Sequence, residues 1–276
     1  MSFRLQIIGG GNMGEALLRG LIESDWASKE ELHVVEPVSE RRDYLAATIS
    51  GVSISEKPLS DLDSLIAVKP DKVSEVLAVL SGLNPTRVLS IAAGVKVSSI
   101  EKILGSNVKV IRAMPNTPAL IGKGSSGVAA GSTATDEDLI WAVEILSAVG
   151  AAMVVEESQL DAVTGLSGSG PAYLFFLAEA LIDAGCEVGL SKEEAKSLVE
   201  QTLLGASALL YESDDPAEVL RQKVTSKGGT TAAAIEVFEN ASFRDTIRAA
   251  VFAATERSLQ LGDAVSYTHL TLPTKA

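Results

Sequence analysis

The chain has 276 residues, of which 46% are hydrophobic and 21% are charged, and its formal net charge is −13 at pH 7. This length predicts two domains of ordinary size, each large enough for a hydrophobic core. The negative charge argues against nucleic acid or an anionic membrane as partner, because phosphate groups would be repelled. The single cysteine, Cys186, excludes an internal disulfide and a metal site built from several cysteines.

The two ends of the chain carry different signals. The N-terminus has no recognisable signal peptide, and no apolar run approaches the roughly 20 residues of a membrane span. Together with the lone cysteine, this predicts a protein of the reducing cytoplasm. At the other end, Val265–Ala276 breaks a helical pattern with threonines and a proline. We therefore expect residues 264–276 to be a non-native tail and leave them out of the fold prediction.

The N-terminal stretch predicts a strand, a glycine-rich turn and a helix in succession. An apolar run ending at Ile8 is followed by G-x-G-x-x-G, and a helical apolar pattern begins near Ala16. In such a turn Gly9 allows the sharp bend, Gly11 lets the backbone approach a pyrophosphate, and Gly14 lets the helix pack close to the strand. The helix N-terminus then presents free N–H groups to the phosphates. The pattern in this context predicts a dinucleotide site.

An acidic residue follows the second predicted strand, Glu31–Val35. Glu36 lies about 20 positions beyond the glycine loop, where NAD sites bind a ribose 2′-hydroxyl. Arg41 and Arg42 follow closely, and they would suit a 2′-phosphate or form a solvated charge cluster on the next helix. The sequence therefore leaves the choice between NADH and NADPH open.

Strands and helices continue to alternate over the first half of the chain. Further strand-like runs are Val52–Ile54, Leu65–Val68, Val88–Ala92, Val108–Ile111, Gly127–Ala130 and Ala152–Val155. Helical patterns lie between several of them: Lys72–Leu80, Ser98–Leu104 with a capping box from Ser98 to Glu101, and a helix opened by Thr135. The alternation predicts an α/β fold, with a doubly wound parallel sheet of Rossmann type over residues 1–155.

Ligands bind such sheets beyond the carboxyl ends of the strands. Three predicted strands end there in notable segments, which are Ala67-Val68-Lys69-Pro70, Ala92-Ala93-Gly94 and Arg112–Ala119. We expect Lys69 to face the ligand, because it occupies the same edge as the glycine loop; an ordinary exposed lysine is the alternative. In the third segment two prolines bracket Asn116 and Thr117, which predicts a stiff turn against the cofactor.

Strand patterns stop near residue 156, and residues 156–263 predict an all-α domain. The expected helix starts are Ser169-Gly170-Pro171, Ser191 with Glu194, Asp215-Pro216 and Asn240. These helices are more apolar than a lone domain of this size needs. We therefore expect a helical dimer interface, with packing inside the domain as the alternative.

A polar loop between two of these helices, Lys223–Thr231, carries the candidate substrate site. Its glycine pair can expose successive backbone N–H groups, and a helix beginning near Thr231 adds more, which suits a small carboxylate. The hydroxyls of Ser226, Thr230 and Thr231 can both donate and accept hydrogen bonds.

The chain resembles the pyrroline-5-carboxylate reductase family over residues 1 to about 263. The matching stretches are Gly9–Gly14, Ala67–Pro70, Arg112–Ala119, Gly165–Tyr173 and Val224–Glu239, the last of which is the family's own signature. One departure is Lys227, where the family usually has proline, but the neighbouring glycines and threonines are intact.

The resemblance implies a Rossmann domain, an α-helical dimerisation domain and often a ring of dimers. It also implies hydride transfer from NADH or NADPH to the imine carbon of 1-pyrroline-5-carboxylate, which gives L-proline in the last step of proline biosynthesis. By the same resemblance Thr231 would hydrogen-bond the ring nitrogen, and Ser226 with the backbone from Gly229 to Thr231 would hold the carboxylate. The expected cofactor contacts are Gly9, Gly11, Asn12, Met13, Gly14, Glu36, Ala67, Val68, Lys69, Pro70, Ala92, Ala93 and Asn116. No metal is expected.

The scarcity of histidine agrees with an imine substrate. Carbonyl reduction usually needs a general acid such as histidine, and this chain has only His33, in a predicted strand, and His269, in the doubtful tail. A cyclic imine can enter already protonated, so orientation of donor and acceptor carries the rate, and proximity can be worth about 7–11 kcal/mol.

Two other functions compete with this prediction. A β-hydroxyacid dehydrogenase would need a catalytic lysine in a helix of the second domain. Lys192 and Lys196 are available, but their polar helix face indicates solvated charges. A non-catalytic nucleotide-sensing protein on the same fold is the other alternative.

Overall fold

The structure is a computed structural model that describes residues 3–270, with the backbone alone from residue 263 onward. Of the predicted tail, residues 264–270 lie in the helix Phe243–Leu270, so the break in the helical pattern expected from Val265 is wrong up to residue 270, and residues 271–276 lie outside the described residues. The non-native origin of the tail stays a prediction. By its internal contacts the chain divides into unit 1, Met1–Ser169 with Ala253–Ala276, and unit 2, Gly170–Phe252. The predicted domains at 1–155 and 156–263 stay predictions.

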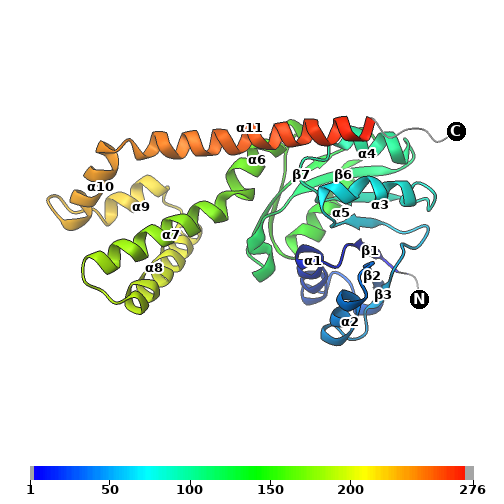
Figure 1. The fold of residues 1–276 in the computed structure, drawn as a ribbon, viewed down its shortest axis with the longest axis horizontal. Helices are drawn as coiled ribbons and strands as arrows, with labels where there is room; N and C mark the ends of the chain where they lie inside the picture. The colour runs from blue at the N-terminus through cyan, green and yellow to red at the C-terminus, as the bar shows by residue number, and fades with distance from the viewer. Residues whose placement is uncertain (1–2, 271–276) are drawn as a thin grey trace. The chain divides into compact units, whose positions relative to one another are not determined.

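Unit 1 contains a twisted sheet whose strand order is β3-β2-β1-β4-β5-β6-β7-β8 (Figure 1). The strands are β1 (Leu5–Ile8), β2 (Leu32–Val35), β3 (Ser53–Ser55), β4 (Ser64–Ile66), β5 (Arg87–Ser90), β6 (Lys109–Met114), β7 (Gly124–Ala130) and β8 (Gly150–Val154). The order reverses at β1, so the glycine loop after β1 lies at the topological switch point, where such sheets bind ligands. The predicted Rossmann-type doubly wound sheet is confirmed.

One strand pair departs from the predicted parallel arrangement. β7 runs antiparallel to β6, whereas the other described pairings are parallel. The connection between these two strands spans only residues 115–123. A parallel crossover needs a dozen or more residues, so the short connection returns the chain as an antiparallel neighbour.

Helices cover both faces of the sheet, as predicted. They are α1 (Asn12–Glu23), α2 (Ser39–Thr48), α3 (Val73–Leu80), α4 (Val97–Leu104), α5 (Asp136–Ser147) and α6 (Leu160–Val163). Side chains of a strand alternate between faces, and this splits the core in two. Leu5 and Ile7 pack with buried residues of α1, α2 and α5, while Ile8 packs with buried residues of α3 and α4.

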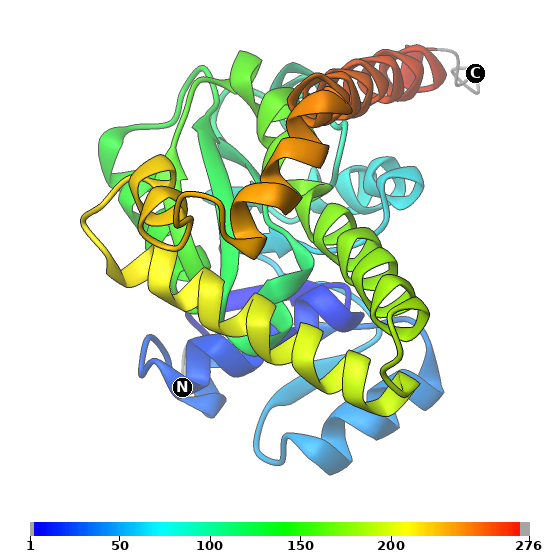
Figure 2. The ribbon, with the colours of Figure 1, turned by 90° about the vertical axis from the view of Figure 1, so that its left-hand side faces the viewer.

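Unit 2 is helical. Its helices are α7 (Gly170–Glu187), α8 (Lys192–Glu212), α9 (Ala217–Lys223), α10 (Thr230–Asn240) and the first part of α11 (Phe243–Leu270). α7 and α8 contact each other, and Figure 2 shows them diverging from the turn that joins them. Within residues 170–252, all of which the structure describes, Ala195 is the only buried residue. An all-α second region is therefore confirmed, but its apolar side chains are mostly exposed within one chain.

The first residues of the helices can be compared one by one with the helix starts predicted from the sequence. The predicted helix start at Thr135 and the predicted cap of Ser191 with Glu194 are confirmed, and each forms a capping box. The one predicted at Ser98 is wrong: α4 begins at Val97, and the Glu101 carboxylate accepts hydrogen bonds from the backbone N–H and hydroxyl of Ser132 instead.

The predicted start of the last helix at Asn240 is also wrong. Asn240 ends α10, and α11 begins at Phe243 after a turn in which Ser242 has φ 52°. Among the described residues, no helix is both long and apolar enough to cross a bilayer.

Candidate active site

The glycine loop leaves the N-terminus of α1 open. Gly9 has φ 109°, a conformation that favours glycine, and a Cβ atom there would lie 2.6 Å from the carbonyl oxygen of Ala67. Gly11 is exposed, and a Cβ on it would meet no atom within 4 Å. The first N–H groups of α1, at Asn12 and Met13, have no acceptor within the helix. The loop therefore has room and donors for a phosphate group.

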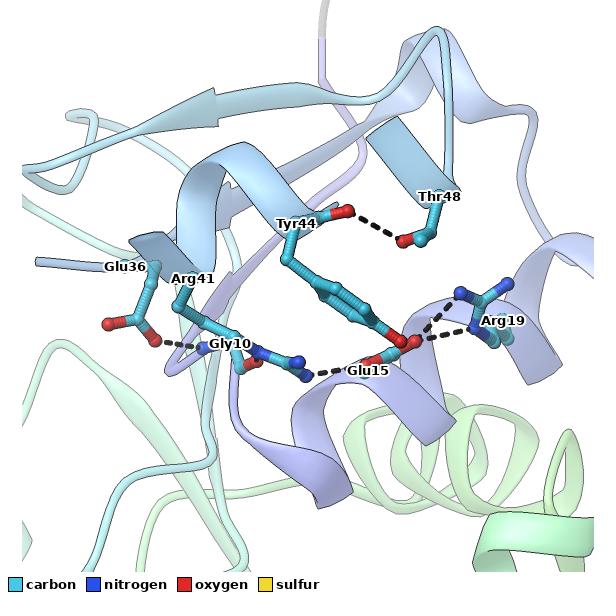
Figure 3. Close-up of polar contacts among 7 residues, drawn as sticks. All are labelled: Gly10, Glu15, Arg19, Glu36, Arg41, Tyr44 and Thr48. Carbon is cyan, nitrogen blue, oxygen red and sulfur yellow. Dashed lines mark hydrogen bonds and ion pairs between the residues drawn. The ribbon is translucent and has the colours of Figure 1, made fainter. Parts of the chain in front are cut away.

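Glu36 lies against this loop, as the sequence spacing suggested. Its side chain is 8% exposed, and its Oε2 accepts a hydrogen bond from the backbone N–H of Gly10 at 2.9 Å (Figure 3). Its Oε1 accepts from the backbone N–H of Val38 at 2.9 Å. The carboxylate is thus fixed beside the glycine-rich turn, at the position where NAD sites bind ribose.

The segments predicted to line the nicotinamide meet in unit 1. Pro70 and Ala93 both line a cavity of about 370 Å³, whose other lining residues are Gly94, Thr164, Ser169, Ala254, Arg257, Ser258 and Leu261. Ala67 and Val68 lie nearer the glycine loop, against Gly9. Lys69 is exposed and precedes the short 3₁₀ helix Pro70–Lys72, and Ala92 is buried.

The contribution of α11 to this cavity was not predicted from the sequence. Arg257 and Ser258 lie on α11 and line the same space as Pro70. The Ser258 hydroxyl donates a 2.6 Å hydrogen bond to the Asp161 carboxylate on α6, which fixes this part of α11 within unit 1. A helical pattern about 190 residues beyond Pro70 carries no local signal of that contact.

Asn116 has a structural role that the sequence did not show. Its Nδ2 donates to the carbonyl oxygen of Ser167 at 2.9 Å, and its Oδ1 accepts from the backbone N–H of Ser125 at 2.8 Å. These bonds tie the proline-bracketed turn to β7 and to the π-helical turn Thr164–Gly168. The predicted contact between Asn116 and the cofactor stays a prediction.

The candidate substrate residues lie together in unit 2. Gly229 is the N-cap of α10, so Thr230 and Thr231 form its first turn. Gly228 has φ 71°, and the Ser226 hydroxyl would lie 2.4 Å from a Cβ on Gly229. The loop thus places three hydroxyl groups beside a helix N-terminus that suits an anion. Thr231 and Gly11 belong to different units. The hydride transfer implied by the resemblance requires the substrate loop and the cofactor to meet, and this stays a prediction.

His33 is a core residue. It is 2% exposed in β2, with Nδ1 3.0 Å from the Ser53 hydroxyl and Nε2 2.8 Å from the Ser55 hydroxyl. Ser55 itself donates to the carbonyl oxygen of Lys57, so it accepts from Nε2–H, and Nδ1 accepts from Ser53. Burial lowers the pKa of His33. This neutral ring stabilises the sheet.

Lys192 and Lys196, the lysines available to a β-hydroxyacid dehydrogenase, are both exposed on α8. Lys196 is 62% exposed on α8 and pairs with Glu200 at 3.7 Å, so it is the solvated charge that the sequence indicated. The described residues contain no group of three or more His, Cys, Asp or Glu side chains that could bind a metal ion.

Family models match both parts of the chain. Residues 157–261 match the pyrroline-5-carboxylate reductase dimerisation family, and residues 4–94 match the family described as NADP oxidoreductase coenzyme F420-dependent.

Individual relatives agree over nearly the whole length. The chain is 44% identical to a curated pyrroline-5-carboxylate reductase of Synechocystis sp., over 95% of this chain and 99% of that protein. The Mycobacterium tuberculosis reductase is 40% identical, over 94% and 96%. A solved reductase from Coxiella burnetii has a TM-score of 0.88 at 35% identity, covering 94% of this chain and 98% of its own. A Plasmodium falciparum reductase solved with NADP bound gives 0.79 at 31%, with the same coverages. The chain therefore belongs to the pyrroline-5-carboxylate reductase family.

Proposed function

We propose that this chain reduces the C=N bond of 1-pyrroline-5-carboxylate to give L-proline, the last step of proline biosynthesis, with NADH or NADPH as reductant. The observation that carries the proposal is the 44% identity to a curated reductase over 95% of the chain. The bound nicotinamide supplies a hydride to the imine carbon. The chain's own residues have to bind and orient the two reactants.

The residues of unit 1 fit the dinucleotide. The N-terminus of α1 at Gly11 would hold the pyrophosphate through backbone N–H groups, with no side chain in the way. Glu36 would face the adenosine ribose. Ala67–Pro70 and Ala92-Ala93 would line the nicotinamide, and the cavity shared by Pro70 and Ala93 supports this.

The loop before α10 would hold the substrate. Its carboxylate would accept hydrogen bonds from the backbone around Gly229–Thr231 and from the Ser226 hydroxyl, favoured by the helix dipole. The Thr231 hydroxyl would hydrogen-bond the ring nitrogen. Because a protonated imine already carries the proton that the amine product needs, this site requires no histidine.

Unit 2 would form a homodimer interface. Its exposed apolar side chains include Phe175 (64% exposed), Phe176 (74%) and Tyr211 (88%). Exposure of this much apolar surface to water is unfavourable in free energy, and burial in an interface would remove it. The dimerisation family matches this region. A ring of such dimers, and residence in the cytoplasm, remain predictions.

A paired assay tests the reaction. The purified chain should oxidise NADH or NADPH only when 1-pyrroline-5-carboxylate is added, with stoichiometric formation of proline. Binding of either nucleotide without oxidation on addition of the imine would contradict the proposal and favour a nucleotide sensor.

A further inference from the structure

The end of β2 carries a network of charged side chains around the glycine loop (Figure 3). Glu36 is held by the backbone N–H groups of Gly10 and Val38, one on each carboxylate oxygen, both at 2.9 Å. An ionised carboxylate has about four acceptor sites, so two backbone bonds leave capacity for a ligand hydroxyl. It has no donor to offer a phosphate.

Arg41, which would be the natural partner of a 2′-phosphate, is already engaged. Its Nε donates to the carbonyl oxygen of Gly10 and its Nη2 to the Glu15 carboxylate, each at 2.5 Å. These two nitrogens form one edge of the guanidinium, the kind of edge that binds a phosphate bidentately. The Tyr44 ring lies 4.7 Å from the Arg41 guanidinium carbon and covers one face of the group.

Glu15 is well placed to keep Arg41 there. Its side chain is 14% exposed, and it also pairs with Arg19 at 2.7 Å. Burial opposes its ionisation, but hydrogen bonds from Arg19 and Arg41 outweigh burial and hold the pKa of the carboxyl below its ordinary value. Glu15 is therefore ionised at neutral pH.

The Arg42 side chain donates its hydrogen bonds to backbone carbonyl oxygens. Its Nη1 donates to the carbonyl oxygens of Glu36 at 2.9 Å and Pro37 at 2.7 Å. Both arginines that suggested a phosphate site in the sequence thus make bonds within the protein. The group beside the turn with acceptor capacity is the Glu36 carboxylate.

We propose that this chain selects NADH over NADPH, with Glu36 accepting a hydrogen bond from the 2′-hydroxyl and repelling a 2′-phosphate, and with Glu15 as a positioning residue that withholds Arg41. The inference rests on the proposed function and adds the cofactor choice. A 2′-phosphate would place further negative charge beside a fixed, poorly hydrated carboxylate, where repulsion is screened weakly. The competing interpretation is that Arg41 and Arg42 turn to bind that phosphate.

The wild-type chain gives the first test. Dissociation constants for NADH and NADPH are measured by nucleotide fluorescence without substrate, and kcat/KM for each is measured with 1-pyrroline-5-carboxylate. NADH should be favoured by at least about tenfold in both measurements, a difference of about 1.4 kcal/mol. Equal or better use of NADPH overturns the inference while leaving the proposed reaction intact. Tight NADH binding without turnover would overturn the proposed reaction and leave the inferred cofactor preference intact.

Two variants separate the roles of the glutamates. Glu36→Gln removes the charge at nearly constant volume, and it should shift the kcat/KM ratio toward NADPH by about tenfold. Glu23→Gln, an exposed glutamate at the other end of α1, is the matched control and should leave the ratio unchanged. An unchanged ratio in Glu36→Gln contradicts its role. If that variant does not fold, the wild-type constants still decide.

Glu15→Gln should release Arg41. We expect KM for NADPH to fall by about threefold to tenfold with kcat unchanged, because freed guanidinium groups bind phosphates strongly. The gain should disappear in the double variant Glu15→Gln/Arg41→Ala. A variant that merely loosened α1 would weaken both nucleotides, and that outcome, or no change, would overturn the positioning role of Glu15.

Discussion

A Cβ atom on Gly14 would lie 2.0 Å from the carbonyl oxygen of Gly9, so α1 and the end of β1 approach as closely as backbone atoms allow. A Cβ atom on Gly11, in the same turn, would meet no atom within 4 Å. The two glycines therefore have different roles. Gly14 lets α1 pack against the end of β1, and Gly11 leaves space for a ligand.

Alanine substitutions should separate these effects. Gly14→Ala collides with backbone, which cannot move aside as a side chain can, and we expect a loss of about 3 kcal/mol or more in the free energy of unfolding. Gly11→Ala has an ordinary φ of −67° and free space, so stability should change by less than about 1 kcal/mol. Its nucleotide affinity should nevertheless fall by about tenfold or more, because the methyl group stands where a pyrophosphate approaches. Urea unfolding and nucleotide titration measure the two quantities. Equal stability losses would contradict the distinction.

Thr231→Ala tests the candidate substrate loop. Loss of one hydrogen bond to a charged group costs about 1.5–3 kcal/mol, so kcat/KM for the imine should fall by about tenfold to a hundredfold. Thr231→Ser retains the hydroxyl and should retain most of the activity. Lys196→Ala, at an exposed ion pair on α8, should leave turnover unchanged. Full activity in Thr231→Ala would mean that the loop does not hold the ring nitrogen.

His33 makes a prediction about pH. Burial lowers its folded-state pKa below the ordinary 6.5, so the unfolded chain takes up a proton before the folded chain does. Stability from this residue is therefore complete above the unfolded pKa and is lost as the pH falls through the folded value. The free energy of unfolding should decrease between about pH 7.5 and about pH 5.5. The decrease should be smaller in His33→Asn, which keeps polar contact with the serines but does not titrate. Identical pH profiles would show that His33 is not the titrating group.

Phe176 tests the interface of unit 2. It is 74% exposed on α7, and burying a carboxylate at a helical interface is strongly unfavourable. Phe176→Asp should convert the dimer to a monomer in sedimentation velocity and remove reductase activity with it. Glu200→Gln, at an exposed position on α8, is the control and should remain dimeric. An unaffected dimer would place the interface on another surface.

The parts of the fold that the sequence predicted depend on local signals. The glycine loop, the helix starts at Thr135 and Ser191, and the proline start of α7 each need only a few adjacent residues. The Ser98 capping box failed for a reason outside that range, since Ser132 in a distant turn takes the Glu101 carboxylate.

Long-range contacts account for the rest. The direction of β7 was readable only from the length of the connection before it, because its composition suits either orientation. The engagement of Arg41 by Glu15 joins two helices, and the lining of the cavity by Arg257 joins the last helix to a strand end near Pro70. The spacing of residues along the chain does not predict contacts between distant segments. The cofactor choice therefore stayed open in the sequence analysis.

The solitary burial of Ala195 in residues 170–252 has a consequence for handling the protein. Because this region buries so few of its own side chains, it needs a second copy of the chain to bury the rest. The folded fraction should therefore depend on protein concentration through the dimerisation equilibrium. Assays at nanomolar enzyme would then show a lag or a progressive decay that disappears at micromolar enzyme. Melting temperatures would rise with each increase in protein concentration.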